Sequence, residues 1–246
     1  MRASARPIRA VLFDLGGTLV DERDFAGWVD LARSAYLELV PDDLAHAYAE
    51  VEAEVDRAPL GLPPPAARLE LWRRVLEAAA GAPVPEATVR RFVDGLLARP
   101  DPPVALYSDV RRCLHGLAAE RRRLGIVSNS TSEASVRRIL HRAGILDYFE
   151  RIVSSGTEGV AKPDPEIFRR AVARLGVAPA EVLYVGNLPR TDALGARGAG
   201  LRSVWLHRDG TGLGDDPPEI TSLLEVALVV RQLEGAAASP EPPSVK

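Results

Sequence analysis

The chain has 246 residues, of which 46% are apolar and 26% are charged, as is usual for a globular protein with a substantial core. Its formal net charge of -3 argues against a general nucleic-acid-binding protein, which normally carries a surplus of basic residues. The single cysteine, Cys113, excludes an intrachain disulfide, and no apolar run is long enough to span a bilayer. We therefore expect a cytoplasmic protein that binds neither nucleic acid nor membrane.

A short apolar stretch near the N-terminus ends in an acid and two glycines. Residues 11–13 are continuously apolar, which predicts a strand buried on both faces of a sheet. Asp14 follows directly, and Gly16 and Gly17 allow a tight turn and a close approach to a ligand. The carboxyl end of a parallel strand is where open α/β sheets bind ligands. An Asp in this position can also serve only as a turn former, so this stretch alone leaves both roles open.

Apolar residues then recur at helical spacing from residue 21 to about residue 99. We expect four helices here, with Pro41 ending the first and its two following acids capping the second. Trp28 and Trp72 lie on apolar stripes and are expected to pack inside this unit. Because such a connection is too long for a loop, it must be a packed helical insert. Its proline-rich loop, residues 58–65, is expected to line the site.

Strands and helices alternate after residue 106. Apolar runs at residues 124–129, 151–154, 181–186 and 202–206 predict strands, and helical patterns lie between them. This alternation predicts a parallel sheet with right-handed crossovers. The expected fold is α/β, a Rossmann-like three-layer α/β/α core with an all-helical cap inserted after the first strand. The core would comprise residues 1–20 and 105–234, the cap residues 21–104, and a disordered tail residues 235–246.

The strand ends carry Asp14, Ser128 with Asn129, and Asn187 with Asp192 beyond Gly186, while Lys162 comes from a loop. This order and spacing resembles the haloacid dehalogenase-like (HAD) hydrolase superfamily. Its first motif, Asp-x-Asp-Gly-Thr-Leu, is similar to residues 14–19. Its strand-ending Ser or Thr, its Lys-Pro and its Gly-Asp-x-x-x-x-Asp are similar to Ser128, to residues 162–163 and to residues 186–192. The helical insert resembles the family's C1-type cap.

The resemblance implies a phosphatase that acts on a small phosphorylated metabolite, as a monomer or homodimer. Asp14 would be the nucleophile that forms an aspartyl-phosphate, assisted by Lys162 and Ser128. Substrate would be bound by residues of the same strand ends and loops: Gly16, Gly17, Thr18, Asn129 and Lys162. Mg²⁺ would be held by an all-oxygen set, as a hard cation prefers: Asp14, the Gly16 carbonyl, Asn187 and Asp192.

Two positions depart from the family pattern. The second Asp of the first motif, the usual general acid and base, is Gly16, and general acid–base catalysis contributes roughly 10²–10⁴-fold. The first acid of the last motif, usually a metal ligand, is Asn187, so Mg²⁺ is expected to bind less tightly. Phosphonoacetaldehyde hydrolases and haloacid dehalogenases also lack that second Asp, so its absence does not exclude an enzyme.

Three alternatives to an acid–base-altered phosphatase follow from these residues. The paired departures are compatible with a non-catalytic module that binds a phosphorylated ligand or a protein partner. Cleavage of a carbon–halogen bond requires neither the missing acid nor a metal. Residues 14–18 also resemble the phosphate loop of sugar kinases of the actin-like ATPase fold. A glycine-rich stretch at residues 210–214 hints at a dinucleotide loop, but residues 215–218 follow it instead of a helix.

Overall fold

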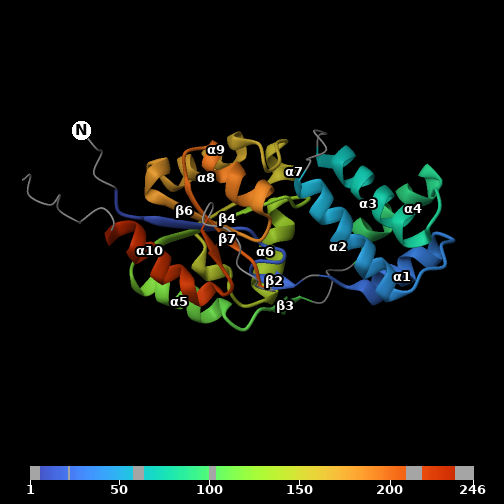
Figure 1. Cartoon of the computed structure of the whole chain (residues 1–246), viewed down its shortest axis with the longest axis horizontal. Coiled ribbons are helices and arrows are strands. Elements are labelled where there is room, and N and C mark those ends of the chain that lie inside the picture. Colours follow the sequence, from blue (N-terminus) through green and yellow to red (C-terminus); the bar gives the residue numbers. More distant parts are fainter. Residues whose placement is uncertain (1–5, 22, 58–63, 100–103, 209–217, 236–246) are drawn as a thin grey trace, which may run out of the picture.

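A six-stranded parallel sheet forms the centre of the larger part of the molecule (Figure 1). The computed structural model describes residues 6–21, 23–57, 64–99, 104–208 and 218–235. The sheet order is β5-β4-β1-β6-β7-β8, with all neighbours parallel. Its strands are β1 (Ala10–Phe13), β4 (Arg123–Ser128), β5 (Arg151–Ser154), β6 (Val182–Gly186), β7 (Arg202–Leu206) and β8 (Glu219–Ile220). The chain therefore runs outward on one side of β1 and then crosses to its other side at β6, which makes β1 the switch point of the sheet.

Helices cover both faces of this sheet. Val11 and Phe13 of β1 pack with α5, α6 and α10, whereas Ala10 and Leu12 point to the opposite face, toward α8 and α9. In Figure 1, α8 and α9 lie above the sheet and α5 and α10 below it. The helices are α5 (Val110–Ala119), α6 (Glu133–Arg142), α7 (Ser155–Glu158), α8 (Pro165–Leu175), α9 (Gly195–Gly198) and α10 (Val226–Gly235). The predicted three-layer α/β/α fold is confirmed.

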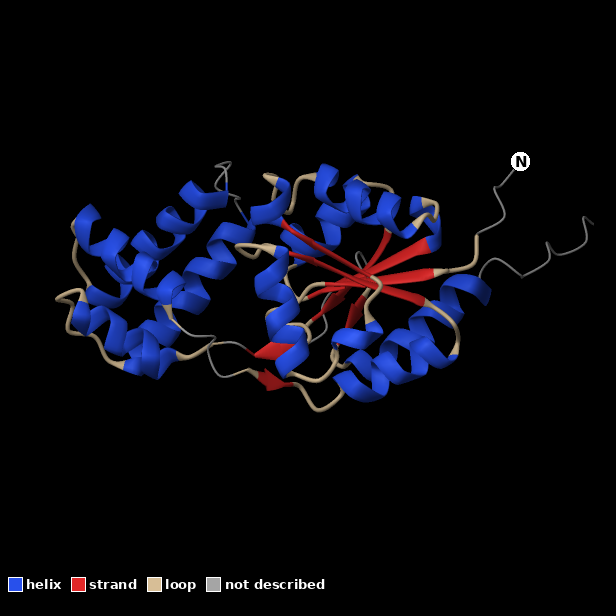
Figure 2. Cartoon of the chain, turned by 180° about the vertical axis from the view of Figure 1, so that it is seen from behind, coloured by secondary structure: helices blue, strands red, loops and turns tan. Residues whose placement is uncertain are grey.

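Four helices that follow β1 pack against one another beside the sheet (Figure 2). They are α1 (Phe25–Ser34), α2 (Pro41–Arg57), α3 (Pro64–Ala80) and α4 (Glu86–Ala98), and we call them the helical cap. The ring of Trp28 meets the ring of Trp72 edge-on at 4.9 Å between centroids, and Tyr48 and Phe92 extend this aromatic cluster. The two tryptophans therefore pack inside the cap, as the apolar stripes predict.

The chain enters and leaves the cap through a two-stranded antiparallel ribbon that the sequence did not reveal. Strand β2 (Val20–Asp21) pairs with β3 (Ala105–Leu106), with Val20 opposite Leu106 and Asp21 opposite Ala105. Two-residue strands leave too short a pattern to be recognised by alternation. The ribbon holds the two crossings of the chain next to each other at the base of the cap.

Two further elements differ from the sequence analysis. Helix α1 ends at Ser34, seven residues before the Pro41 that was expected to end it, because Tyr36 has a left-handed backbone with φ 64°. The polar residues that follow the predicted strand at 181–186, to which the sequence analysis assigned no structure of their own, form a π-helical turn, η3 (Pro189–Leu194), that leads directly into α9. Short 3-10 turns also occur, namely η1 (Leu146–Tyr148), η2 (Pro179–Glu181) and η4 (Leu223–Glu225).

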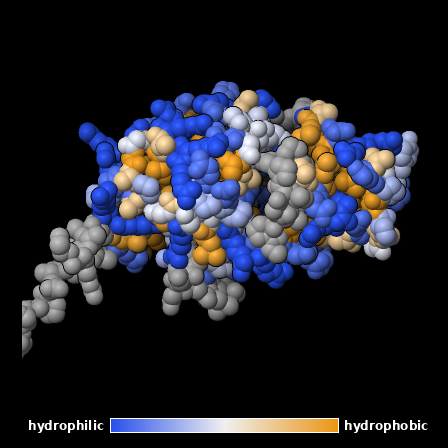
Figure 3. All heavy atoms as spheres, turned by 90° about the horizontal axis from the view of Figure 1, so that it is seen from above, coloured by the Kyte–Doolittle hydropathy of each residue, from blue (hydrophilic) through white to orange (hydrophobic). Residues whose placement is uncertain are grey.

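The surface is mostly hydrophilic on the face drawn in Figure 3, with apolar residues visible over the helical cap. None of the helices in the described ranges is long and apolar enough to cross a lipid bilayer. The expected disordered tail beyond residue 235, most of the expected lining loop 58–65 and the glycines at 210–214 lie outside the described residues.

Candidate active site

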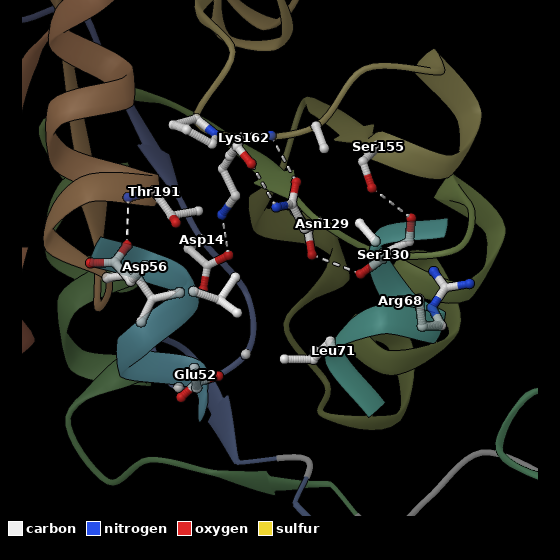
Figure 4. A pocket seen from close by; sticks show the side chains of 18 of the residues that line it. Asp14, Glu52, Asp56, Arg68, Leu71, Asn129, Ser130, Ser155, Lys162 and Thr191 are labelled. Carbon is white, nitrogen blue, oxygen red and sulfur yellow. Dashed lines mark hydrogen bonds and ion pairs between the residues drawn. The ribbon is translucent and has the colours of Figure 1, made fainter. Parts of the chain in front are cut away.

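The polar strand ends meet at one cavity between the carboxyl edge of the sheet and the cap helices α2 and α3. The cavity has a volume of about 960 Å³. Seven of the predicted site residues line it: Asp14, Gly16, Gly17, Ser128, Asn129, Lys162 and Asn187. The other two, Thr18 and Asp192, are buried directly behind it. The cap contributes Glu52, Asp56, Arg68, Leu71 and Trp72, some of which are labelled in Figure 4.

A buried ammonium group joins two carboxylates at the floor of the cavity. Lys162 Nζ lies 2.6 Å from Asp14 Oδ1 and 2.6 Å from Asp192 Oδ1, and 3.1 Å from the Tyr184 hydroxyl (Figure 4 shows the contact with Asp14). Lys162 is 6% exposed and Asp192 is fully buried. The Asp14 and Asp192 carboxylates and the Lys162 ammonium together carry a net negative charge. This charge favours binding of a further cation beside them.

Burial and neighbouring charges act in opposite directions on the ionisation of Asp14 and Lys162. Burial raises the pKa of Asp14 to about 6, since the Lys162 ammonium only partly offsets the loss of hydration and the Asp192 carboxylate adds to the rise. For Lys162, burial lowers the pKa, but the charges of Asp14 and Asp192 more than compensate, so that its pKa lies above the ordinary value. Lys162 therefore stays charged at neutral pH and orients an Asp14 carboxylate that faces the cavity.

The backbone of Lys162 is fixed by a neighbouring strand end. Asn129 accepts a hydrogen bond from the Lys162 amide at 2.9 Å and donates its own amide to the Lys162 carbonyl at 3.1 Å. The Ser128 hydroxyl lies 2.7 Å from that of Ser130 at the end of β4. These residues present hydroxyl and amide groups beside Asp14, which suits an anionic ligand.

The turn after Asp14 fits only because it contains glycine. Gly17 has φ 73°, and a Cβ at this position would lie 2.6 Å from Asn187 Nδ2. Thr18 donates its hydroxyl to Asn187 Oδ1 at 3.2 Å, which ties the first turn to the segment after β6. The conformational freedom of Gly17 thus lets two of the predicted metal-binding segments pack side by side.

Asp192 is held more firmly than the sequence indicates. Its Oδ1 lies within 3.1 Å of both Lys162 Nζ and the Tyr184 hydroxyl, and its Oδ2 accepts the Leu188 amide at 3.0 Å. Gly186 leaves room for it, since a Cβ there would lie 2.4 Å from the Asp192 carboxyl carbon. Tyr184, a residue of the apolar strand β6, escaped the sequence analysis because an aromatic side chain in a buried strand is normally core.

The cap is anchored to this segment by Asp56, which the sequence analysis also missed. Its Oδ2 accepts the Arg190 amide at 3.0 Å and its Oδ1 accepts the Thr191 amide at 2.6 Å. These amides begin the η3 turn and have no partner within it, so a residue of α2 caps a turn of the core. Arg23, one of the cationic residues that line the cavity, pairs with Asp21 at 2.8 Å.

Replacing Asp56 with alanine should loosen this anchor. The variant leaves two amides without their acceptor, and we expect a loss of about 1–3 kcal/mol in unfolding free energy together with faster amide exchange in residues 188–194. Urea unfolding and hydrogen exchange measure the two effects. Asp56→Asn retains one acceptor oxygen, so its unfolding free energy and its amide exchange rates should lie between those of Asp56→Ala and the wild type. Equal exchange rates in all three proteins would contradict the role of Asp56.

The parallel sheet and the polar centre at its switch point define an α/β protein with a ligand site where such sheets carry one. A family model described as haloacid dehalogenase-like hydrolase matches residues 8–200, so the chain belongs to that family. The resemblance found in the sequence motifs is thereby confirmed.

Individual relatives agree with this assignment. The phosphoserine phosphatase of Thermus thermophilus is 36% identical over 162 residues, which are 65% of this chain and 61% of that protein. The glyceraldehyde 3-phosphate phosphatase of Pyrococcus abyssi is 30% identical over 206 residues, 80% of this chain and 81% of that one. Among solved structures, the HAD-hydrolase YfnB from Bacillus subtilis superposes with a TM-score of 0.68 at 21% identity, covering 92% of this chain and 99% of its own.

Proposed function

We propose that the chain is a phosphatase that hydrolyses a small phosphorylated metabolite through an aspartyl-phosphate on Asp14. The observation that carries this proposal is the Asp14 carboxylate, which lines the cavity while Lys162 holds it at 2.6 Å from behind. Both relatives described above are named as phosphatases of small phosphorylated compounds. We further propose the core and cap boundaries given by the sequence analysis, with residues 21–104 as the cap domain.

The proposed reaction has two steps. An Asp14 oxygen attacks the phosphorus atom, the bond from phosphorus to the leaving oxygen breaks, and the leaving alcohol takes up a proton. Water then attacks the aspartyl-phosphate, which releases inorganic phosphate and regenerates the carboxylate. Lys162 stabilises the charge on the transferred group, while Ser128, Asn129 and the turn formed by Gly16, Gly17 and Thr18 contribute hydrogen-bond donors to its oxygens.

The donor set at the floor of the cavity fits Mg²⁺ in chemical type. Asp14, the Gly16 carbonyl, Asn187 and Asp192 offer only oxygen, and the surplus negative charge of the buried trio favours a cation. Such an ion would supply charge neutralisation for the phosphoryl group. Asp192 already accepts hydrogen bonds on both oxygens, and the described residues contain no cluster of three or more acidic, His or Cys side chains placed around a metal. Weak binding of Mg²⁺ is the expected consequence.

Phosphate release from p-nitrophenyl phosphate and acetyl phosphate, with and without Mg²⁺, tests the proposal. We expect turnover that rises with added Mg²⁺ and saturates only at high concentration of the ion, because Asn187 supplies no charge. Phosphoserine and glyceraldehyde 3-phosphate are the natural first alkyl substrates to try. Release of chloride from a 2-haloacid without phosphatase activity would instead indicate a dehalogenase, and inactivity in all assays would favour a binding module.

A further inference from the structure

Four carboxyl groups line the cavity within the described part of the chain, and three of them are already engaged. Asp14 is held by Lys162, Asp56 accepts two backbone amides, and the exposed Asp164 caps the first turn of α8 through the Glu166 amide. The fourth is Glu52, whose Oε1 accepts the Tyr48 hydroxyl at 3.0 Å. Its other oxygen has no hydrogen-bond partner among the described residues.

Glu52 is placed by the same helix that anchors the cap. It lies one turn before Asp56 on α2, so that both side chains face the core when Asp56 caps η3. Figure 4 shows Glu52 on the same side of the cavity as Asp14 and Asp56, with Arg68 and Ser155 across from it. The anchor thus brings a half-buried carboxyl group of the cap to the side of the cavity where the proposed nucleophile lies.

The surroundings of Glu52 favour its protonated form. Burial raises its pKa, and the carboxylates of Asp192 and Asp56 raise it further. The Tyr48 hydroxyl and the Arg23 guanidinium act in the opposite direction, and the pKa remains above its ordinary value. A carboxyl group that keeps its proton closer to neutral pH is the kind of group that can donate a proton to a leaving alcohol.

We propose that Glu52 is the proton donor and acceptor of the reaction, a role for which Gly16 has no side chain. This inference rests on the proposed phosphatase function. As Asp14 attacks phosphorus and the bond to the leaving oxygen breaks, the Glu52 carboxyl gives its proton to that oxygen and becomes a carboxylate. The carboxylate then takes a proton from the water that attacks the aspartyl-phosphate. Phosphate leaves, Asp14 is restored, and Glu52 is again protonated.

The basicity of the leaving oxygen determines how strongly the rate depends on proton donation. Two substrates of similar shape but different leaving groups can therefore test for a proton donor. Phenyl phosphate releases a more basic oxygen than p-nitrophenyl phosphate and therefore depends more on a proton donor. We expect Glu52→Gln to lower kcat for phenyl phosphate by about 10²-fold or more and kcat for p-nitrophenyl phosphate by less than about tenfold. Glutamine keeps the acceptor for Tyr48, so the fold should be preserved.

Two further variants sharpen the test. Glu54→Gln, two residues away on an exposed part of α2 where Glu54 pairs with Arg74, should leave both rates unchanged. Gly16→Asp should restore hydrolysis of phenyl phosphate in the Glu52→Gln background, and Gly16 does not have the positive φ that would oppose a side chain. The wild-type rate with phenyl phosphate should fall as the pH rises through the pKa of Glu52, and this basic limb should vanish in Glu52→Gln.

Each result has a distinct meaning. An equal loss for both substrates would make Glu52 a residue that only shapes the cavity and would overturn the inference, as would unchanged rates in Glu52→Gln while Asp14→Asn is inactive. Turnover that persists in Asp14→Asn would instead remove the proposed function itself. Selective loss with phenyl phosphate, rescued by Gly16→Asp, would support the inference.

Discussion

Asp14→Asn is expected to lower kcat for p-nitrophenyl phosphate by at least about 10⁴-fold, because the amide oxygen is a poor nucleophile and the neighbouring Asp192 carboxylate is fully buried with both oxygens hydrogen-bonded. The substitution keeps the size of the side chain, and its amide can still accept a hydrogen bond from Lys162. Binding of inorganic phosphate should therefore survive. Steady-state kinetics and calorimetric titration with phosphate measure the two quantities.

The chemical intermediate gives an independent readout. In the wild type, rapid acid quenching during turnover of a labelled phosphoester should trap label on the protein in a form that hydroxylamine removes, as an acyl phosphate requires. The label should be absent from Asp14→Asn and should map to the peptide that contains residue 14. A stable label on a serine or histidine would contradict the proposed chemistry even if Asp14→Asn were inactive.

Lys162→Met is expected to be the most damaging substitution for stability. It removes the only ammonium that contacts both Asp14 and Asp192 among the described residues and leaves two buried carboxylates near each other. Breaking a buried ion pair by deleting one partner costs about 3–5 kcal/mol in unfolding free energy. Chemical unfolding of the variant and the wild type in EDTA, where no divalent cation can replace the ammonium, measures the difference.

The pH dependence of that difference identifies its cause. Without Lys162, the ammonium that lowers the pKa of Asp14 is gone, while burial and the Asp192 carboxylate still raise it, so the folded-state pKa of Asp14 rises further above its value in the unfolded chain. The loss of unfolding free energy is then fully present above this raised pKa and becomes smaller as the pH falls through it. The difference in unfolding free energy between the variant and the wild type should therefore narrow as the pH falls toward about 6, the pKa that Asp14 has beside Lys162. A deficit that does not change with pH would point to lost packing instead.

The site residues that follow strands could be predicted from the sequence, whereas those on a helix of the cap could not. Asp14, Ser128 and Asn187 follow short apolar runs, and parallel strands necessarily bring their carboxyl ends to one edge. Glu52 and Asp56 lie on the polar face of an amphipathic helix, where a carboxylate ordinarily meets water. Only the docking of α2 against η3 shows that these two acids face the core, and no spacing within the sequence of α2 encodes that contact.

Dependence on tertiary contacts also explains why the end of α1 and the η3 turn were not predicted. The end of α1 depends on the left-handed backbone of Tyr36, a residue type that seldom signals such a turn. The η3 turn begins with amides that Asp56 satisfies from a different part of the chain, so residues 187–192 read as a loop when taken alone. Both features depend on tertiary contacts, and these override local preference.

The ribbon formed by β2 and β3 determines how easily the inserted helical segment can be deleted or replaced. Because Asp21 lies opposite Ala105, the chain positions that flank the inserted segment lie one strand spacing apart, about 5 Å. A segment with adjacent ends can be deleted and replaced by a two-residue hairpin turn, or exchanged for another helical unit, without stretching the sheet. Such an exchange leaves the strands of the sheet and Asp14 in place, but it also removes Glu52 and Asp56, so a grafted unit has to supply its own contacts with the cavity and with η3.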